Sequence, residues 1–123
     1  MTEPQELPTE RPEIDVVDVP ERTRYEASLE GEDGLAAFLR YRRSERWIAL
    51  LHTEVQDGYE GRGIGSRLAS AVFADARARD LKVIPKCPFI LRWLVRHTEQ
   101  HDVLLRPLGE DAPPIEGSPL EPA

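Results

Sequence analysis

Three glycines at alternate positions, Gly61, Gly63 and Gly65, form the most informative chemical pattern in this sequence. They stand in the segment 60–65 (EGRGIG), directly before a stretch with helical periodicity. Because glycine has no Cβ, successive backbone amides there can turn toward a ligand and approach it closely. The free amides and the dipole at the start of a helix also favour an anion. The segment therefore predicts a binding site for a diphosphate.

Two other phosphate-binding patterns fit this loop poorly. A Walker loop ends in Gly-Lys-Ser/Thr, whereas this one continues as Gly65-Ser66-Arg67, without that lysine. A dinucleotide fingerprint needs a third glycine where Ser66 stands, and an acidic residue at the end of the next strand, where the chain has Ile84-Pro85. Considered alone, the loop could also be a helix-entry turn that only needs glycine geometry.

Acidic, imidazole and thiol side chains near the expected ends of strands could transfer protons. Glu54 and His52 are two residues apart, so they share one face of a strand and could act together as a general base. Cys87 precedes Pro88 at an expected helix start and follows Lys86, an environment that favours the thiolate. Each has a structural alternative. Glu54 and His52 could be hydrogen-bonded residues at a strand end, and Cys87 a small buried residue.

Other polar residues support weaker hypotheses. His97 and His101 are four residues apart, but no third ligand accompanies them, so we expect no metal site. Several arginines between positions 40 and 46 are more typical of a solvated strand face than of a nucleic-acid-binding surface. Arg62 and Arg67 are better placed to contact the phosphates of a cofactor.

The acidity of the chain is concentrated at its two ends. Of the formal net charge of −7, the first 15 residues and the last 17 contribute −4 each, which leaves +1 for residues 16–106. The terminal segments are rich in proline and acidic residues and would bury little apolar surface, so we expect disordered tails at 1–13 and 107–123. One domain is expected over 14–106, and its charge allows an anionic ligand.

The composition also limits the environment in which this protein works. A single cysteine excludes an internal disulfide, and no apolar run approaches the roughly 20 residues that span a bilayer. The acidic N-terminus lacks the features of a signal peptide. We therefore expect a cytoplasmic protein that does not bind membranes, and a monomer or weak dimer.

The periodicity of apolar residues predicts four strands, a loop, a helix, a strand and a second helix. The expected elements are strands at 14–19, 22–29, 35–42 and 47–55, a helix at 64–80, a strand at 81–84 and a helix from Pro88. Residues 35–42 could be helical by periodicity alone, and residues 47–51 have the continuous apolar character of a strand covered on both faces. Since a strand–helix–strand unit forms a right-handed parallel crossover, the sequence predicts an α/β (α+β) fold with a mixed sheet.

The stretch from Phe38 to about Val103 resembles a compact branch of the GNAT superfamily, the small GNAT-like or YjdJ-type N-acetyltransferases. Three blocks carry the resemblance: residues 50–55 (LLHTEV), residues 81–89 (LKVIPKCPF), and the glycine loop, which matches the superfamily pattern Gln/Arg-x-x-Gly-x-Gly/Ala. Two positions depart from the family. Glu60 stands where Gln or Arg is usual, and Trp93 stands where a tyrosine is expected on the last helix.

The resemblance implies a mixed sheet of about five strands with splayed fourth and fifth strands and two main helices. Acetyl-CoA (acetyl-coenzyme A) would lie in the opening, with its diphosphate on the glycine loop. The residues that this picture assigns to the cofactor are Val55, Gly61, Arg62, Gly63, Ile64, Gly65, Ser66 and Cys87. Cys87, Glu54 and His52 are the expected catalytic residues.

The function implied by the resemblance is the transfer of an acetyl group from acetyl-CoA to an amine of unknown identity, on a small molecule or a protein. The alternative is a non-catalytic coenzyme A-binding or regulatory module. The small size of the domain, Glu60 and Trp93 motivate this alternative, because an indole N–H is not a suitable acid for a thiolate leaving group.

Overall fold

A computed structural model describes residues 13–32 and 34–108 of the chain. The predicted tails therefore fall outside the described residues, except at their inner ends. The elements are β1 (Ile14–Val19), η2 (Pro20–Arg22), β2 (Arg24–Leu29), β3 (Ala37–Arg43), β4 (Trp47–Val55), α1 (Ile64–Ala78), β5 (Lys82–Pro85), α2 (Pro88–Arg96) and η3 (Thr98–Val103). The predicted order of strands and helices is confirmed, and the segment predicted as a strand at 35–42 forms β3, at Ala37–Arg43. The two short 3-10 helices, η2 and η3, were not predicted.

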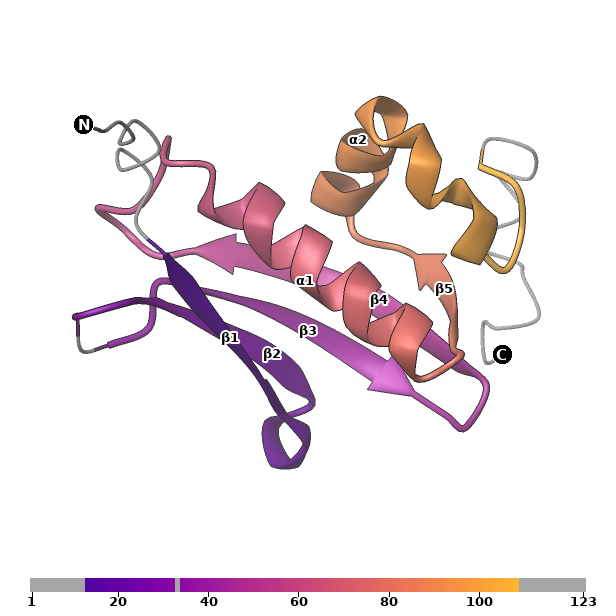
Figure 1. Cartoon of the computed structure of the whole chain (residues 1–123), viewed down its shortest axis with the longest axis horizontal. Coiled ribbons are helices and arrows are strands. Elements are labelled where there is room, and N and C mark those ends of the chain that lie inside the picture. The colour runs from indigo at the N-terminus through magenta and orange to yellow at the C-terminus, as the bar shows by residue number, and fades with distance from the viewer. Residues whose placement is uncertain (1–12, 33, 109–123) are drawn as a thin grey trace, which may run out of the picture.

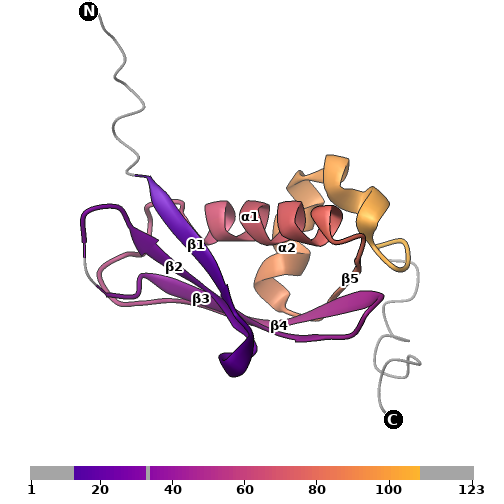
Figure 2. The same ribbon diagram turned by 60° about the horizontal axis from the view of Figure 1, so that its bottom comes forward.

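The strands form one mixed sheet in the order β1-β2-β3-β4-β5 (Figure 1). The first four strands pair antiparallel, and β5 pairs parallel with β4. The connection between β4 and β5 is α1, which lies across the sheet and contacts every strand (Figure 2). The prediction of a mixed sheet built around a parallel crossover is confirmed.

The parallel pairing between β4 and β5 is short. It runs from Trp47 opposite Lys82 to Leu50 opposite Pro85, and the backbone N–H of Lys86 then donates to the Leu50 carbonyl at 2.9 Å. After this point the chain leaves β5 for α2, whereas β4 continues to Val55. The last residues of β4 therefore lie beyond the end of β5, and the edge of β4 that faces β5 is open there.

A β-bulge lies in β4 at the point where this opening begins. In the pairing with β3, Arg40 is opposite His52, whereas the next residue, Tyr41, is opposite Leu50. Leu51 is therefore an extra residue in β4. A bulge bends its strand and increases the local twist. The bulge thus bends β4 between the part that pairs with β5 and the last residues of the strand.

The core lies between the sheet and α1. Apolar residues of α1 recur at three- and four-residue intervals, and Leu68, Val72 and Phe73 are fully buried against strand residues such as Leu39 and Leu50. Ala71, at the margin of this apolar face, is only half-buried. The second helix joins this core through Trp93, whose ring centroid lies 5.1 Å from that of Phe73.

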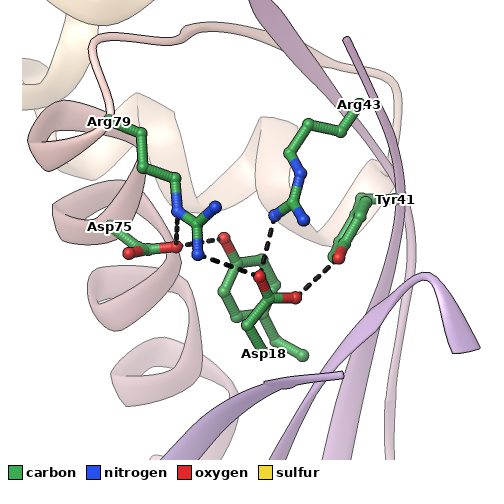
Figure 3. Close-up of polar contacts among 6 residues, drawn as sticks. Asp18, Tyr41, Arg43, Asp75 and Arg79 are labelled. Carbon is green, nitrogen blue, oxygen red and sulfur yellow. Dashed lines mark hydrogen bonds and ion pairs between the residues drawn. The ribbon is translucent and has the colours of Figure 1, made fainter. Parts of the chain in front are cut away.

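A polar cluster connects strands β1 and β3 to the C-terminal end of α1 (Figure 3). The Asp18 carboxylate accepts hydrogen bonds from the Tyr41 hydroxyl at 2.6 Å, from Arg43 at 2.8 Å and from Arg79 at 3.1 Å. Arg79 also donates to Asp75 at 2.8 Å. Burial and the hydrogen bond to Asp18 raise the pKa of Tyr41 to about 12.

Tyr25 extends this cluster by donating its hydroxyl to Asp75 at 2.6 Å. Burial, with the hydrogen bond to Asp75, raises the pKa of Tyr25 above its ordinary value. The cluster therefore fixes the position of α1 on the sheet from the end of the helix opposite to the glycine loop.

Candidate functional site

The glycine loop has the backbone conformation that only glycine adopts easily. Gly61 and Gly63 have φ values of 78° and 76°, in the left-handed region that a Cβ disfavours. Gly63 is the N-cap of α1, and the first turn of this helix carries no acidic side chain. The free amides and the positive dipole end of α1 are therefore not neutralised by the helix itself.

Gly65 serves a different purpose, because it allows α2 to pack closely against the start of α1. A Cβ at this position would lie 2.9 Å from Cζ of Phe89, which is closer than van der Waals contact permits. The Trp93 indole N–H donates to the Ser66 hydroxyl at 2.9 Å, which adds a second contact between the two helices. The first turns of both helices therefore lie side by side.

A groove of about 660 Å³ opens between the glycine loop and α2. It gathers six residues predicted to contact the cofactor: Val55, Gly61, Gly63, Ile64, Gly65 and Ser66. Arg62 does not line the groove, and its guanidinium carbon lies 5.5 Å from the centroid of the Tyr59 ring. Glu60 lines the groove, but its carboxylate accepts a hydrogen bond from the backbone N–H of Gly58 at 3.1 Å.

The groove also has lining residues that the sequence analysis did not single out as ligands. Tyr59 lies at the loop, and Arg92 and Arg96 project from α2. The Tyr59 hydroxyl donates to Glu32 at 3.1 Å, and this hydrogen bond raises the pKa of Tyr59. The spacing of the two arginines, four residues apart, places them on one face of α2, but only the contact between the helices shows that this face borders the glycine loop.

Cys87 lies at the opening between β4 and β5 and is buried. Its side chain is only 2% exposed, and its Sγ lies 3.4 Å from Oγ1 of Thr53, a residue of β4 beyond the end of β5. It is the N-cap residue of α2, as predicted, but its side chain makes no capping hydrogen bond. The burial matches the structural alternative for this cysteine, whereas the contact with Thr53 places the thiol beside the opening.

His52 and Glu54 point to the sheet face opposite the core. Their partners on β3, Arg40 and Phe38, alternate with the buried Leu39. The His52 Nε2 and Glu54 Oε1 atoms lie 3.2 Å apart, and both side chains are about half exposed to solvent, at 55% and 50%. The structure therefore brings the two side chains together on one face of β4, as predicted. They lie outside the groove, on the sheet face opposite the core.

The two histidines that are four residues apart are hydrogen-bonded to backbone carbonyls. His97 and His101 each donate a ring N–H to a carbonyl of α2, that of Trp93 and that of Leu94 respectively, both at 2.8 Å. Across residues 13–32 and 34–108, no three histidine, cysteine or acidic side chains are grouped so as to hold a metal ion. Over the same residues, no helix has the length and apolar character that crossing a membrane requires.

Comparison with known proteins identifies the fold and its relatives. The profile of the GCN5-related N-acetyltransferase family matches residues 24–103. Protein NATD1 of Mus musculus is 34% identical over 74 residues, which are 60% of this chain and 67% of that protein. Protein NATD1 of Homo sapiens is 34% identical over 73 residues, which cover 59% of this chain and 65% of that protein. The match thus spans about two thirds of each relative.

A solved structure shows the same arrangement of elements. A GCN5-like protein from Staphylococcus aureus, determined by NMR in solution, superimposes with a TM-score of 0.59 at 26% sequence identity. The match covers 79% of this chain and 93% of that one. The shared fold therefore includes nearly all of the bacterial protein, and these comparisons do not separate a compact branch from the rest of the family.

Proposed function

Because this chain belongs to the GCN5-related N-acetyltransferase family, we propose that it transfers an acetyl group from acetyl-CoA to the amine of an acceptor. The observation that carries the proposal is the groove at the start of α1, which is also lined by Val55 at the end of β4. Its volume of about 660 Å³ lies within the usual range for sites that bind small molecules and cofactors.

The residues at the groove fit the phosphate end of coenzyme A. Gly61 and Gly63 leave the backbone amides of the loop accessible, and α1 directs its positive dipole end at the same place. Arg92 and Arg96 add positive charge on the opposite wall. The groove can therefore hold a diphosphate on the backbone amides of the loop.

The open edge of β4 fits the amide-containing arm of coenzyme A. The backbone N–H of Gln56 donates to the Ala36 carbonyl on the β3 side, at 2.8 Å. Since backbone groups alternate in direction along a strand, Thr53 and Val55 direct theirs to the opposite side, where β5 has already ended. Extended chains bind such free edges through main-chain hydrogen bonds, and the arm would pair with β4 in this way.

Acyl transfer requires loss of a proton from the amine and gain of a proton by the leaving thiolate. In our proposal Glu54, hydrogen-bonded to His52, accepts the amine proton, directly or through a water. The indole N–H of Trp93 is directed at Ser66 and is not an acid that could protonate the thiolate. We place Cys87, whose Sγ lies 3.4 Å from Oγ1 of Thr53, on the thiol side. Either it positions the thioester, and the leaving thiolate takes its proton from water, or its thiol accepts the acetyl group transiently and passes its own proton to the thiolate.

The test is the release of free thiol from acetyl-CoA in the presence of a broad panel of amines. Glu54→Gln should lower the rate by roughly 100-fold, as expected for loss of a general base. Glu45→Gln is the matched control, because Glu45 is also exposed but lies in the turn between β3 and β4. Absence of calorimetric heat when coenzyme A is added would contradict the proposal at its first step.

A non-catalytic coenzyme A-binding module is the second candidate function. The burial of Cys87 and the engaged indole of Trp93 favour it, because neither group is then well placed to give a proton to a leaving thiolate. This candidate predicts saturable binding of acetyl-CoA without thiol release. Intact mass after incubation adds a further distinction, because transient acetylation of Cys87 would increase the mass by one acetyl group.

A further inference from the structure

Two arginines of α2 give one wall of the groove a concentrated positive charge. Arg92 and Arg96 are one helical turn apart, about 6 Å along the axis, and both line the groove. Neither guanidinium group forms an ion pair or hydrogen bond with another residue of the described segments. Among the groove-lining residues the acidic side chain is that of Glu60, which is hydrogen-bonded to the backbone of Gly58.

The packing between the helices fixes where these arginines lie relative to the glycine loop. Phe89 contacts Gly65, and Trp93 contacts Ser66, so the first part of α2 is held against the first turn of α1. Arg92 precedes Trp93 directly, and Arg96 lies one turn farther along α2. The arginines therefore form a second positive region, beside the backbone amides of the loop and continuing away from them along the groove.

We infer that Arg92 and Arg96 bind the 3′-phosphate of coenzyme A, an inference that rests on the proposed function. Coenzyme A carries this phosphate monoester in addition to its diphosphate. A monoester bears a charge of about −1.5 to −2 at neutral pH, and guanidinium groups bind it with paired hydrogen bonds. Backbone amides suit the diphosphate, whereas two neighbouring guanidiniums match the charge of the monoester. The protein therefore distinguishes coenzyme A from its form without the 3′-phosphate.

The experiment is calorimetric titration with coenzyme A and with 3′-dephospho-coenzyme A. The wild-type protein should bind coenzyme A roughly tenfold more tightly, since ion pairs at a partly exposed site contribute modestly. The double variant Arg92→Ala/Arg96→Ala should bind both ligands equally, with the affinity of the wild type for the dephospho form. Arg42→Ala is the matched control. It removes an exposed arginine of β3 outside the groove and should keep the tenfold ratio.

Three results would overturn the inference, and they differ from one another. Equal affinity of the wild type for the two ligands would show that the 3′-phosphate is not recognised. An equal loss of affinity for both ligands in the double variant would show that the arginines contact the diphosphate instead. If neither ligand binds the wild type, the proposed function fails as well. Both arginine side chains are exposed, so unchanged thermal unfolding of the double variant without ligand confirms that it is folded.

Discussion

Replacing Asp18 by alanine is expected to lower the free energy of unfolding by about 3 kcal/mol. The side chain of Asp18 is 14% exposed and that of its partner Arg43 is 19% exposed, so the substitution leaves a largely buried guanidinium without its carboxylate. The Tyr41 hydroxyl loses its acceptor as well. The contact with Arg79 counts for little, because that arginine is 43% exposed and solvent screens its charge.

The same cluster makes the free energy of unfolding depend on pH in the alkaline range. The pKa of Tyr41 is raised to about 12 in the folded protein, whereas a tyrosine in the unfolded chain titrates near 10. The contribution of Tyr41 is therefore complete below about pH 10 and is lost as the pH rises toward 12. Two units correspond to about 2.7 kcal/mol. The raised pKa of Tyr25 acts in the same direction.

Urea denaturation at pH 7 to 11, followed by fluorescence, measures both effects, and tyrosinate absorbance follows the titration. Asp15→Ala is the control, because Asp15 is an exposed residue of the same strand and should change stability by less than about 0.5 kcal/mol. Asp18→Ala should also show a smaller alkaline loss, because only burial then raises the pKa of Tyr41. A loss at pH 7 no larger than that of Asp15→Ala would refute the reasoning.

The glycines near the loop give two further predictions. Gly65→Ala should lower the free energy of unfolding, measured by urea denaturation, by about 1 to 2 kcal/mol through overpacking against Phe89. Adding Phe89→Leu to this variant should restore most of that stability. A Gly65→Ala protein as stable as the wild type would contradict the prediction. Gly61→Ala and Gly58→Ala should each cost about 1 kcal/mol, because both glycines have positive φ with open space around them. Only Gly61 lines the groove, so only Gly61→Ala should weaken coenzyme A binding in calorimetry.

Local patterns in the sequence were sufficient to predict the elements and the glycine loop. The range of β1 agrees with its apolar alternation, and α1 begins at Ile64, directly after the glycines. The predicted start of β2, at residue 22, was less accurate. There η2 and Thr23, which has a φ of 50°, form a turn, and the strand begins at Arg24. The pattern of apolar residues does not reveal such a turn. The polar residues of the turn look the same in the sequence whether they belong to a strand or not.

The features that define the site more closely depend on contacts that the sequence does not contain. Leu51 lies in an apolar run, so its side chain gives no sign that it is the extra residue of a bulge. Cys87 looks equally suited to a reactive and to a buried position until its contact with Thr53 is known. Helical spacing places Arg92 and Arg96 on one face of α2, but it does not show what this face borders.

The alternate glycines of the loop satisfy two separate physical requirements, although the sequence presents them as one pattern. Gly61 and Gly63 are needed for their backbone conformation, because both have positive φ. Gly65 is needed for its lack of a side chain, which lets Phe89 approach. Because Phe89 lies in the first turn of α2, the contact at Gly65 sets the distance between the loop amides and the arginines of that helix. The two regions of the groove that we propose to bind anions are therefore coupled through an apolar contact that carries no charge itself.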